Sequence, residues 1–129
     1  MAVLRFSVLV FICVAFAHCK NAINITDHID KNAPLTLTIN KRDSLTGLTT
    51  SNRFTIQINS EKYKKVIDWC KKNSNGWQST PASFAPDIGL TQSNFRLLYF
   101  TQSDGVVIGF DAKQYSKQIK KGELDFLIE

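Results

Sequence analysis

The stretch Phe95-Arg-Leu-Leu-Tyr-Phe-Thr-Gln-Ser-Asp-Gly-Val-Val-Ile-Gly-Phe-Asp111 places two strongly apolar runs on either side of an Asp-Gly pair. Asp-Gly is a strong hairpin signal because a type I′ turn needs positive φ at both central residues, which Asp tolerates and Gly adopts freely. We therefore predict a β-hairpin with Asp104 and Gly105 as its two-residue turn. The predicted cross-strand pairs are Tyr99 with Phe110, Thr101 with Ile108, and Phe100 with Gly109.

Two short segments before this hairpin, residues 35–39 and 54–58, alternate strictly between apolar and polar side chains. A period of two predicts half-buried strands, and the turn-forming residues between them favour a hairpin. Ser60 then caps a predicted helix that ends in the Asn-Ser-Asn-Gly run at residues 73–76. The apolar residues of this helix have the i, i+3, i+4, i+7 spacing of one helical face: Tyr63, Val66, Ile67 and Cys70.

The segment after the Asp-Gly hairpin predicts a second, shorter helix over residues 113–121, with Asp111 as its cap, and a final strand over residues 124–128. The predicted order of elements is ββαββαβ. The expected fold class is α+β, a single small domain with a mainly antiparallel sheet and two helices packed on one face. This domain is predicted to span residues 34–129, after an N-terminal tail over residues 18–33.

The first residues are typical of a secretory signal peptide, since a short positive start is followed by an almost unbroken apolar run over residues 6–16. The run is shorter than the roughly 20 residues that a membrane-spanning helix needs. Ala15-Phe16-Ala17 has the small-x-small pattern of a cleavage site, so we predict a signal peptide over residues 1–17 and no membrane span. The protein is then exported, to the periplasm of a bacterial producer or outside a eukaryotic one.

A lipid-anchored envelope protein, acylated at Cys19, is an alternative interpretation of the same region, although His18 would then occupy a position where a small residue is expected. Cleavage after Ala17 removes Cys13 and leaves Cys19 and Cys70. An even pair of cysteines in an oxidising compartment predicts one disulfide, Cys19 to Cys70. Two unpaired thiols are the other possibility.

The chain is mildly basic, with a formal net charge of +5, and its lysines form two small clusters around residues 62–72 and 113–121. Lysines spaced in this way on helices usually form solvated faces, so we expect no nucleic-acid partner. His18 and His28 are the only histidines, and both lie in the predicted tail. The sequence contains no set of residues with metal-ligand spacing and no Gly-rich phosphate loop, so neither a metal nor a cofactor is expected. A small secreted hydrolase or toxin that uses pairs of carboxylates is an alternative function.

The long segment over residues 77–94 is the predicted contact surface, because loops carried by a rigid scaffold often carry function. Large apolar and turn-forming residues in this loop are the candidate partner-binding residues: Trp77, Phe84, Pro86, Asp87 and Leu90. In the other interpretation, Trp77 and Phe84 only cover one end of the core.

In size and compartment the chain resembles periplasmic immunity proteins, such as those against bacteriocins, and small secreted inhibitors, which act by occupying the active site of a toxin or an enzyme. This resemblance concerns outline alone. We therefore expect an exported binding protein that inhibits or neutralises a protein partner rather than an enzyme. The oligomeric state stays open.

Overall fold

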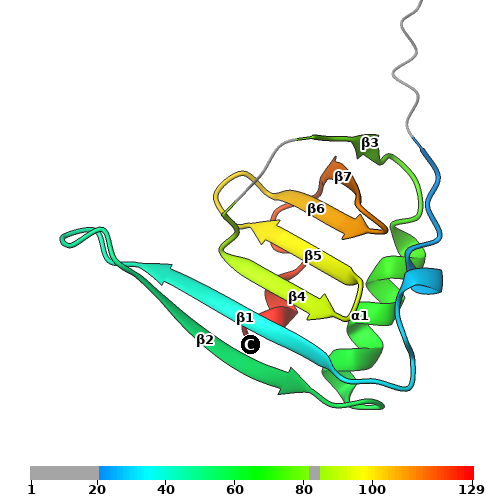
Figure 1. The fold of residues 1–129 in the computed structure, drawn as a ribbon, viewed down its shortest axis with the longest axis horizontal. Coiled ribbons are helices and arrows are strands. Elements are labelled where there is room, and N and C mark those ends of the chain that lie inside the picture. Colours follow the sequence, from blue (N-terminus) through cyan, green and yellow to red (C-terminus); the bar gives the residue numbers. More distant parts are fainter. Residues whose placement is uncertain (1–20, 82–84) are drawn as a thin grey trace, which may run out of the picture.

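The computed structural model describes residues 21–81 and 85–129. These residues form a seven-stranded antiparallel sheet, and one α-helix packs against one face of the sheet (Figure 1). The strands are β1 (Leu35–Arg42), β2 (Thr49–Ile56), β3 (Gln78–Ser79), β4 (Ile88–Gln92), β5 (Phe95–Phe100), β6 (Gly105–Phe110) and β7 (Lys113–Gln118). The helix is α1 (Glu61–Lys72), and η1 (Ile25–His28) and η2 (Asp125–Leu127) are short 3₁₀ helices. The order across the sheet is β2-β1-β4-β5-β6-β7-β3. The predicted α+β class with a mainly antiparallel sheet is confirmed.

The helix α1 begins and ends where the sequence predicts. The Ser60 hydroxyl accepts a hydrogen bond from the Tyr63 backbone N–H at 3.2 Å, which satisfies one of the free donors of the first turn. Tyr63, Val66 and Cys70 are buried on one face, as their spacing predicts. At the other end, the Asn73 backbone N–H donates to the carbonyl of Cys70.

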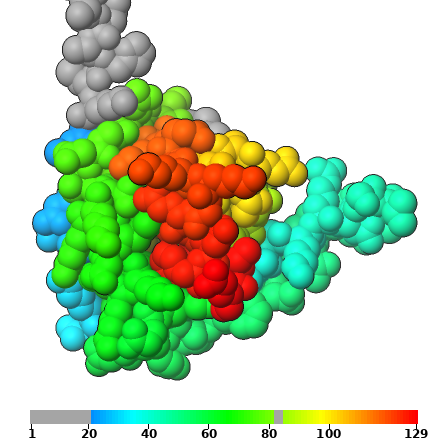
Figure 2. Space-filling model, turned by 180° about the vertical axis from the view of Figure 1, so that it is seen from behind, coloured from blue at the N-terminus to red at the C-terminus, as the bar shows by residue number. Residues whose placement is uncertain are grey.

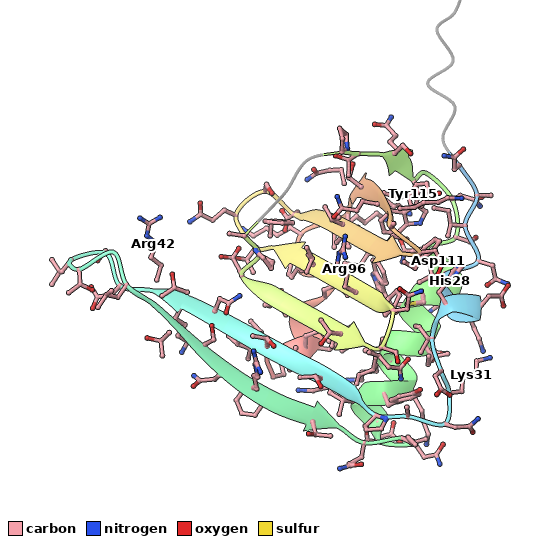
Figure 3. The ribbon with its side chains drawn as sticks, viewed as in Figure 1. His28, Lys31, Arg42, Arg96, Asp111 and Tyr115 are labelled. Atoms are coloured by element: carbon pink, nitrogen blue, oxygen red, sulfur yellow. The ribbon has the colours of Figure 1, made fainter. Side chains whose placement is uncertain are left out.

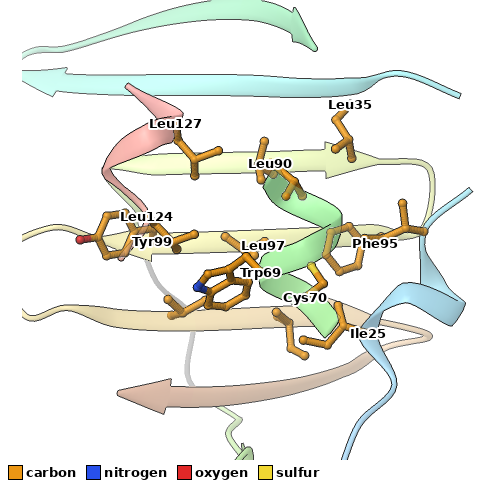
Figure 4. Close-up of a cluster of buried hydrophobic side chains, with 14 of the residues drawn as sticks. Ile25, Leu35, Trp69, Cys70, Leu90, Phe95, Leu97, Tyr99, Leu124 and Leu127 are labelled. Atoms are coloured by element: carbon orange, nitrogen blue, oxygen red, sulfur yellow. The ribbon is translucent and has the colours of Figure 1, made fainter. Parts of the chain in front are cut away.

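The core lies between α1 and the sheet face turned toward it. Figure 4 shows Leu97 and Tyr99 of β5 close to Trp69 and Cys70 of α1. Alternate residues of each central strand point into this layer, which explains why β5 has the burial pattern of a strand with one dry face. Each large apolar side chain buried there contributes on the order of 1.5–3 kcal/mol to folding.

Residues 21–33, which the sequence predicts as part of a tail, pack against the domain. Asn21 forms an isolated β-bridge with Trp77, and the Ile23 backbone N–H donates to the carbonyl of Ser74 at 2.7 Å. Ile25 is fully buried. This segment therefore supplies part of the core.

The β5–β6 hairpin has a longer turn than predicted. Tyr99 pairs with Val106, and residues 101–104 form the turn, so the predicted Asp104-Gly105 loop and its three cross-strand pairs are wrong. Asp104 does have positive φ (54°), but it is the last residue of the turn, and its carboxylate accepts a hydrogen bond from the Tyr99 hydroxyl at 3.2 Å. The register differs from the prediction by an even number of residues, so the same side chains still face the core.

The predicted order ββαββαβ and the second helix are also wrong. Asp111 and Ala112 both have positive φ (49° and 58°) and form a two-residue turn that folds the chain back along β6. Phe110 consequently pairs with Lys113, and most of the predicted helix is strand β7. The predicted final strand is the 3₁₀ helix η2. The predicted loop over residues 77–94 contains β3 and β4.

One half of the β1–β2 hairpin projects beyond the rest of the sheet, as both views of the molecule show (Figures 1 and 2). β1 pairs with β4 only over residues 36–39, and all residues from 41 to 55 are exposed. We call residues 40–54 the arm. Its tip is ordered by hydrogen bonds, since the Asp43 carboxylate accepts from the backbone N–H groups of Leu45 (2.7 Å) and Thr46 (3.2 Å).

Candidate partner-binding surface

The predicted contact residues do not form one surface. Trp77 and Leu90 are both 0% exposed and belong to the core, which is the second interpretation that the sequence allowed for Trp77. The Trp77 indole N–H donates to the Asn73 carbonyl at 2.6 Å. Phe84 lies outside the described residues. A partner approaching from solvent would not reach Trp77 or Leu90.

Pro86 and Asp87 are half-buried and fasten the base of the arm. The Pro86 carbonyl accepts a hydrogen bond from the Asn40 side chain at 2.9 Å, and the Asp87 carbonyl accepts from the Asn40 backbone N–H at 2.8 Å. The Asp87 carboxylate accepts from both the backbone N–H (2.8 Å) and the hydroxyl (3.1 Å) of Thr101. These hydrogen bonds connect β1 to the β5–β6 turn. Pro86 and Asp87 therefore stabilise the fold at the base of the arm.

The face of the sheet that points away from α1 is not covered by any helix of residues 21–81 and 85–129, and we call it the open face. Strand register places on it the polar residues Thr36, Thr38, Arg53, Thr91, Arg96, Gln114 and Ser116, together with the half-buried Leu98 and Phe100 and the buried Val107. Figure 3 shows Arg96 over the central strands and Arg42 extending from the arm. A mixed surface of this kind, with apolar side chains among polar ones, is typical of protein interfaces.

The charges of the sheet have one sign. The described strands carry six basic residues and no acidic one: Lys41, Arg42, Arg53, Arg96, Lys113 and Lys117. The eleven Asp and Glu residues of the chain all lie in turns, loops and helices. Strand register places Arg42, Arg53 and Arg96 on the open face, and the other three share the α1 side of the sheet. The strands of the open face therefore carry positive charge, which attracts an acidic surface.

Arg96 is the most clearly positioned of these basic side chains. Arg96, Gly109 and Gln114 form one row across β5, β6 and β7. The guanidinium lies over Gly109, because a Cβ atom added to this glycine would be only 2.6 Å from Arg96 Nε. Its Nη2 donates to Gln114 Oε1 at 2.7 Å. The arginine is exposed and yet fixed, which lowers the entropy that it would lose on binding.

A shallow hollow of about 500 Å³ adjoins the apolar part of the open face. Phe100 and Val107 line it together with polar residues of β3 and β7, among them Gln78, Ser116 and Gln118. Hollows of this kind receive anchoring side chains in protein complexes. The hollow and the Arg96 row lie on the same strands, β5 to β7.

Sequence reasoning missed Arg96, although a signal was present. An arginine interrupts the apolar run of β5, and a glycine occupies β6 where that strand passes it. The correct strand register is needed to bring the two together, and the predicted turn gave another register. The size of Trp77 predicts an interface anchor, whereas in the structure its indole packs inside the domain.

The predicted disulfide stays a prediction, because Cys19 lies outside the described residues. Cys70 is buried next to the sheet and forms no disulfide with any residue that the structure describes. Burial in apolar surroundings raises the pKa of the Cys70 thiol to about 12. The reduced thiol is therefore protonated at neutral pH and has little reactivity.

Within residues 21–81 and 85–129, no group of three or more His, Cys, Asp or Glu side chains is arranged to hold a metal ion. No helix in the same residues has the length and apolar character needed to cross a membrane. Comparison of the chain with protein-family models, curated proteins and solved structures finds no match.

Proposed function

We propose that the protein is an exported binding protein that neutralises a partner protein, a toxin or an enzyme, by covering its functional surface with the open face of the sheet. Export rests on the signal-peptide pattern at residues 1–17. The open face takes the place of the loop that the sequence suggested, because Trp77 and Leu90 are core residues.

The fixed Arg96 guanidinium is the observation that carries the proposal. Arginine is among the residues that most often dominate binding energy at protein interfaces. The contact with Gly109 and the hydrogen bond to Gln114 hold its planar fork in one orientation before any partner arrives. Such a group forms paired hydrogen bonds with a carboxylate at a low entropic cost.

Charge indicates the chemistry of the partner. Because no described strand carries an Asp or Glu, a positively charged partner surface would be repelled and an acidic one attracted. We therefore expect an acidic partner surface, with an apolar side chain that enters the hollow beside Phe100 and Val107.

Capture of the partner tests this proposal. The secreted protein is immobilised and exposed to nuclease-treated extracts from the producer and from organisms that it meets, and captured proteins are identified by mass spectrometry. Arg96→Glu should weaken capture by at least about tenfold, since a buried charge pair that is lost or reversed costs more than 1.4 kcal/mol. Lys71→Glu, an equal charge change on the exposed side of α1, should leave capture unchanged.

Gly109→Ala separates position from charge. The Cβ atom of the alanine would lie only 2.6 Å from Arg96 Nε, so the guanidinium would have to move. The charge of Arg96 is kept. We expect weaker capture with little loss of stability, because the displaced atoms end a flexible side chain. Capture that is equal for the wild type and both open-face variants would refute the assignment of the site. A parallel capture from untreated extracts is the control, and capture that occurs there but disappears after nuclease treatment would replace the protein partner by a nucleic acid.

A further inference from the structure

Strand β2 is an unusually unprotected sheet edge. It is eight residues long and ends the sheet on one side, where no other described strand pairs with it. Proteins usually block such an edge with Pro, Lys, a bulge or a covering segment. β2 contains neither Pro nor Lys, and its pairing with β1 is continuous over all eight residues. The opposite edge, β3, has only two residues.

Two apolar features accompany this edge, one near each end of β2. The tip of the arm exposes Leu45 (95%) and Leu48 (69%). At the other end, a groove of about 520 Å³ lies beside β2 on the α1 face, and apolar residues from β2 and the C-terminus line it: Phe54, Ile56, Leu127 and Ile128. Figure 2 shows the C-terminal residues beside the hairpin on this side. Exposed apolar groups that cluster at a free edge indicate an interaction site.

We propose that β2 pairs antiparallel with β2 of a second copy of this chain, which joins two sheets into one across a two-fold axis. A second copy fits because an antiparallel edge is complementary to itself, and because β2 has a single charged residue, Arg53. The assembly is complete with two copies, because each copy has one long free edge among its described strands and the pairing uses both of these edges. The pair is therefore a dimer and does not extend into a fibre.

The symmetry restricts the register. A two-fold axis perpendicular to the sheet keeps both α1 helices on the same side, so paired residues of β2 must share a face. Even-numbered residues of β2, such as Phe54 and Ile56, lie on the α1 face, because they pair with Leu37 and Leu35. Paired residues must therefore both be even-numbered or both odd-numbered. Two registers of this kind keep nearly all of β2 paired, one centred on Asn52 and one centred on Arg53.

Charge selects between these two registers. Centring on Arg53 places two guanidinium groups directly opposite each other, which is destabilising. Centring on Asn52 instead places Arg53 opposite Ser51 of the second copy. The same register places Ile56 opposite Leu48 of the second copy. Leu48 of each arm then lies at the apolar groove of the other copy. The dimer therefore has two such contacts, one at each end of the paired strands.

Cross-linking tests the register. In a Cys19→Ser background, Asn52→Cys should place two thiols opposite each other and give a disulfide-linked dimer under mild oxidation. Thr50→Cys, on the same face of the same strand, should remain largely unlinked, because two residues of strand separate it from the axis. The probe of the rejected register keeps Arg53 and combines Ser51→Cys with Thr55→Cys, because these exposed positions face each other only when the axis passes through Arg53. Efficient linking through this pair and not through Asn52→Cys would overturn the proposed register.

Light scattering after size-exclusion chromatography tests the dimer itself. The wild type should have twice the mass of one chain at tens of micromolar, and Asn52→Lys should raise the dissociation constant at least about tenfold by placing two lysines together. Gln102→Lys adds the same charge in the exposed β5–β6 turn and should leave the mass unchanged. A monomeric wild type at hundreds of micromolar, or an Asn52→Lys variant that dimerises as well as the wild type, would overturn the proposal.

Discussion

At the scale of single residues, Gln92 shows how one buried polar side chain joins two distant parts of the chain. It is 8% exposed at the end of β4. Its Nε2 donates to the carbonyls of Asp30 and Ala33, each at 2.8 Å, and its Oε1 accepts from the Asp30 backbone N–H at 2.7 Å. The segment before β1, which lacks a regular pattern of its own, is therefore fixed to the sheet.

We predict that Gln92→Leu lowers the free energy of unfolding by about 2–4 kcal/mol, because the Asp30 N–H and two carbonyls lose their partner in a partly buried site. Urea denaturation followed by circular dichroism measures the change. Gln102→Leu, in an exposed turn, should alter stability by less than about 0.5 kcal/mol. Equal stability of the wild type and Gln92→Leu would show that these hydrogen bonds contribute nothing.

Among single residues, the sequence predicts the burial of Tyr63, Val66 and Cys70 correctly because helical periodicity is local information. It does not predict Gln92 or Arg96, whose partners lie 62 and 18 residues away. The partner of a polar side chain follows from strand register, and register depends on turns that a short motif specifies only in part.

At the scale of elements, the two hairpins β5–β6 and β6–β7 explain the main errors of prediction. The Asp-Gly pair, a strong signal for a two-residue turn, ends a four-residue turn instead. The two-residue turn with two positive φ values is formed by Asp111 and Ala112, which lack the glycine usual at this position. Residues 113–118 have weak helical periodicity, and pairing with β6 makes them a strand, since tertiary contacts override local propensity.

We predict that Ala112→Gly raises the free energy of unfolding by about 0.5–1 kcal/mol. Ala112 has φ of 58°, a conformation that costs a residue with a Cβ atom about 1–2 kcal/mol and glycine little, and the gain is reduced by the greater freedom of glycine in the unfolded chain. Thermal and urea unfolding would measure it. Ala22→Gly, an exposed position without a positive φ, provides the control and should give no stabilisation. A loss of stability in Ala112→Gly would contradict the strained turn.

At the scale of the whole molecule, three buried ionisable groups make the fold sensitive to alkaline pH. Desolvation raises the pKa of the Cys70 thiol from 9.0 to about 12. Burial also raises the pKa values of Tyr63 and Tyr99, and the Asp104 carboxylate adds to the increase at Tyr99. Each group keeps its proton in the folded protein at a pH where the unfolded chain has lost it.

We predict that the contribution of Cys70 to the free energy of unfolding, measured in a reducing buffer, is constant below about pH 9. This contribution falls between pH 9 and about pH 12. In this window the folded state binds more protons than the unfolded state, so the free energy of unfolding decreases as pH rises. The thiol contributes at most about 4 kcal/mol across the window. Urea titrations from pH 7 to 11 measure the slope, and Cys70→Val should reduce it, leaving the part due to Tyr63 and Tyr99. An identical slope in both proteins would exclude Cys70 as its source.

The pairing of β1 with β4 also sets the order in which the chain is able to fold during synthesis. β1 and β2 are neighbours in sequence, so their hairpin closes as soon as residue 56 is available. Thr36, however, pairs with Thr91, and the segment around Asp30 depends on Gln92. Ser74 and Trp77, which pair with Ile23 and Asn21, are made earlier, but the hydrogen bonds from Gln92 and the strand that covers Thr36 are missing until more than two thirds of the chain exists. The N-terminal part is the first to be made and among the last to become native.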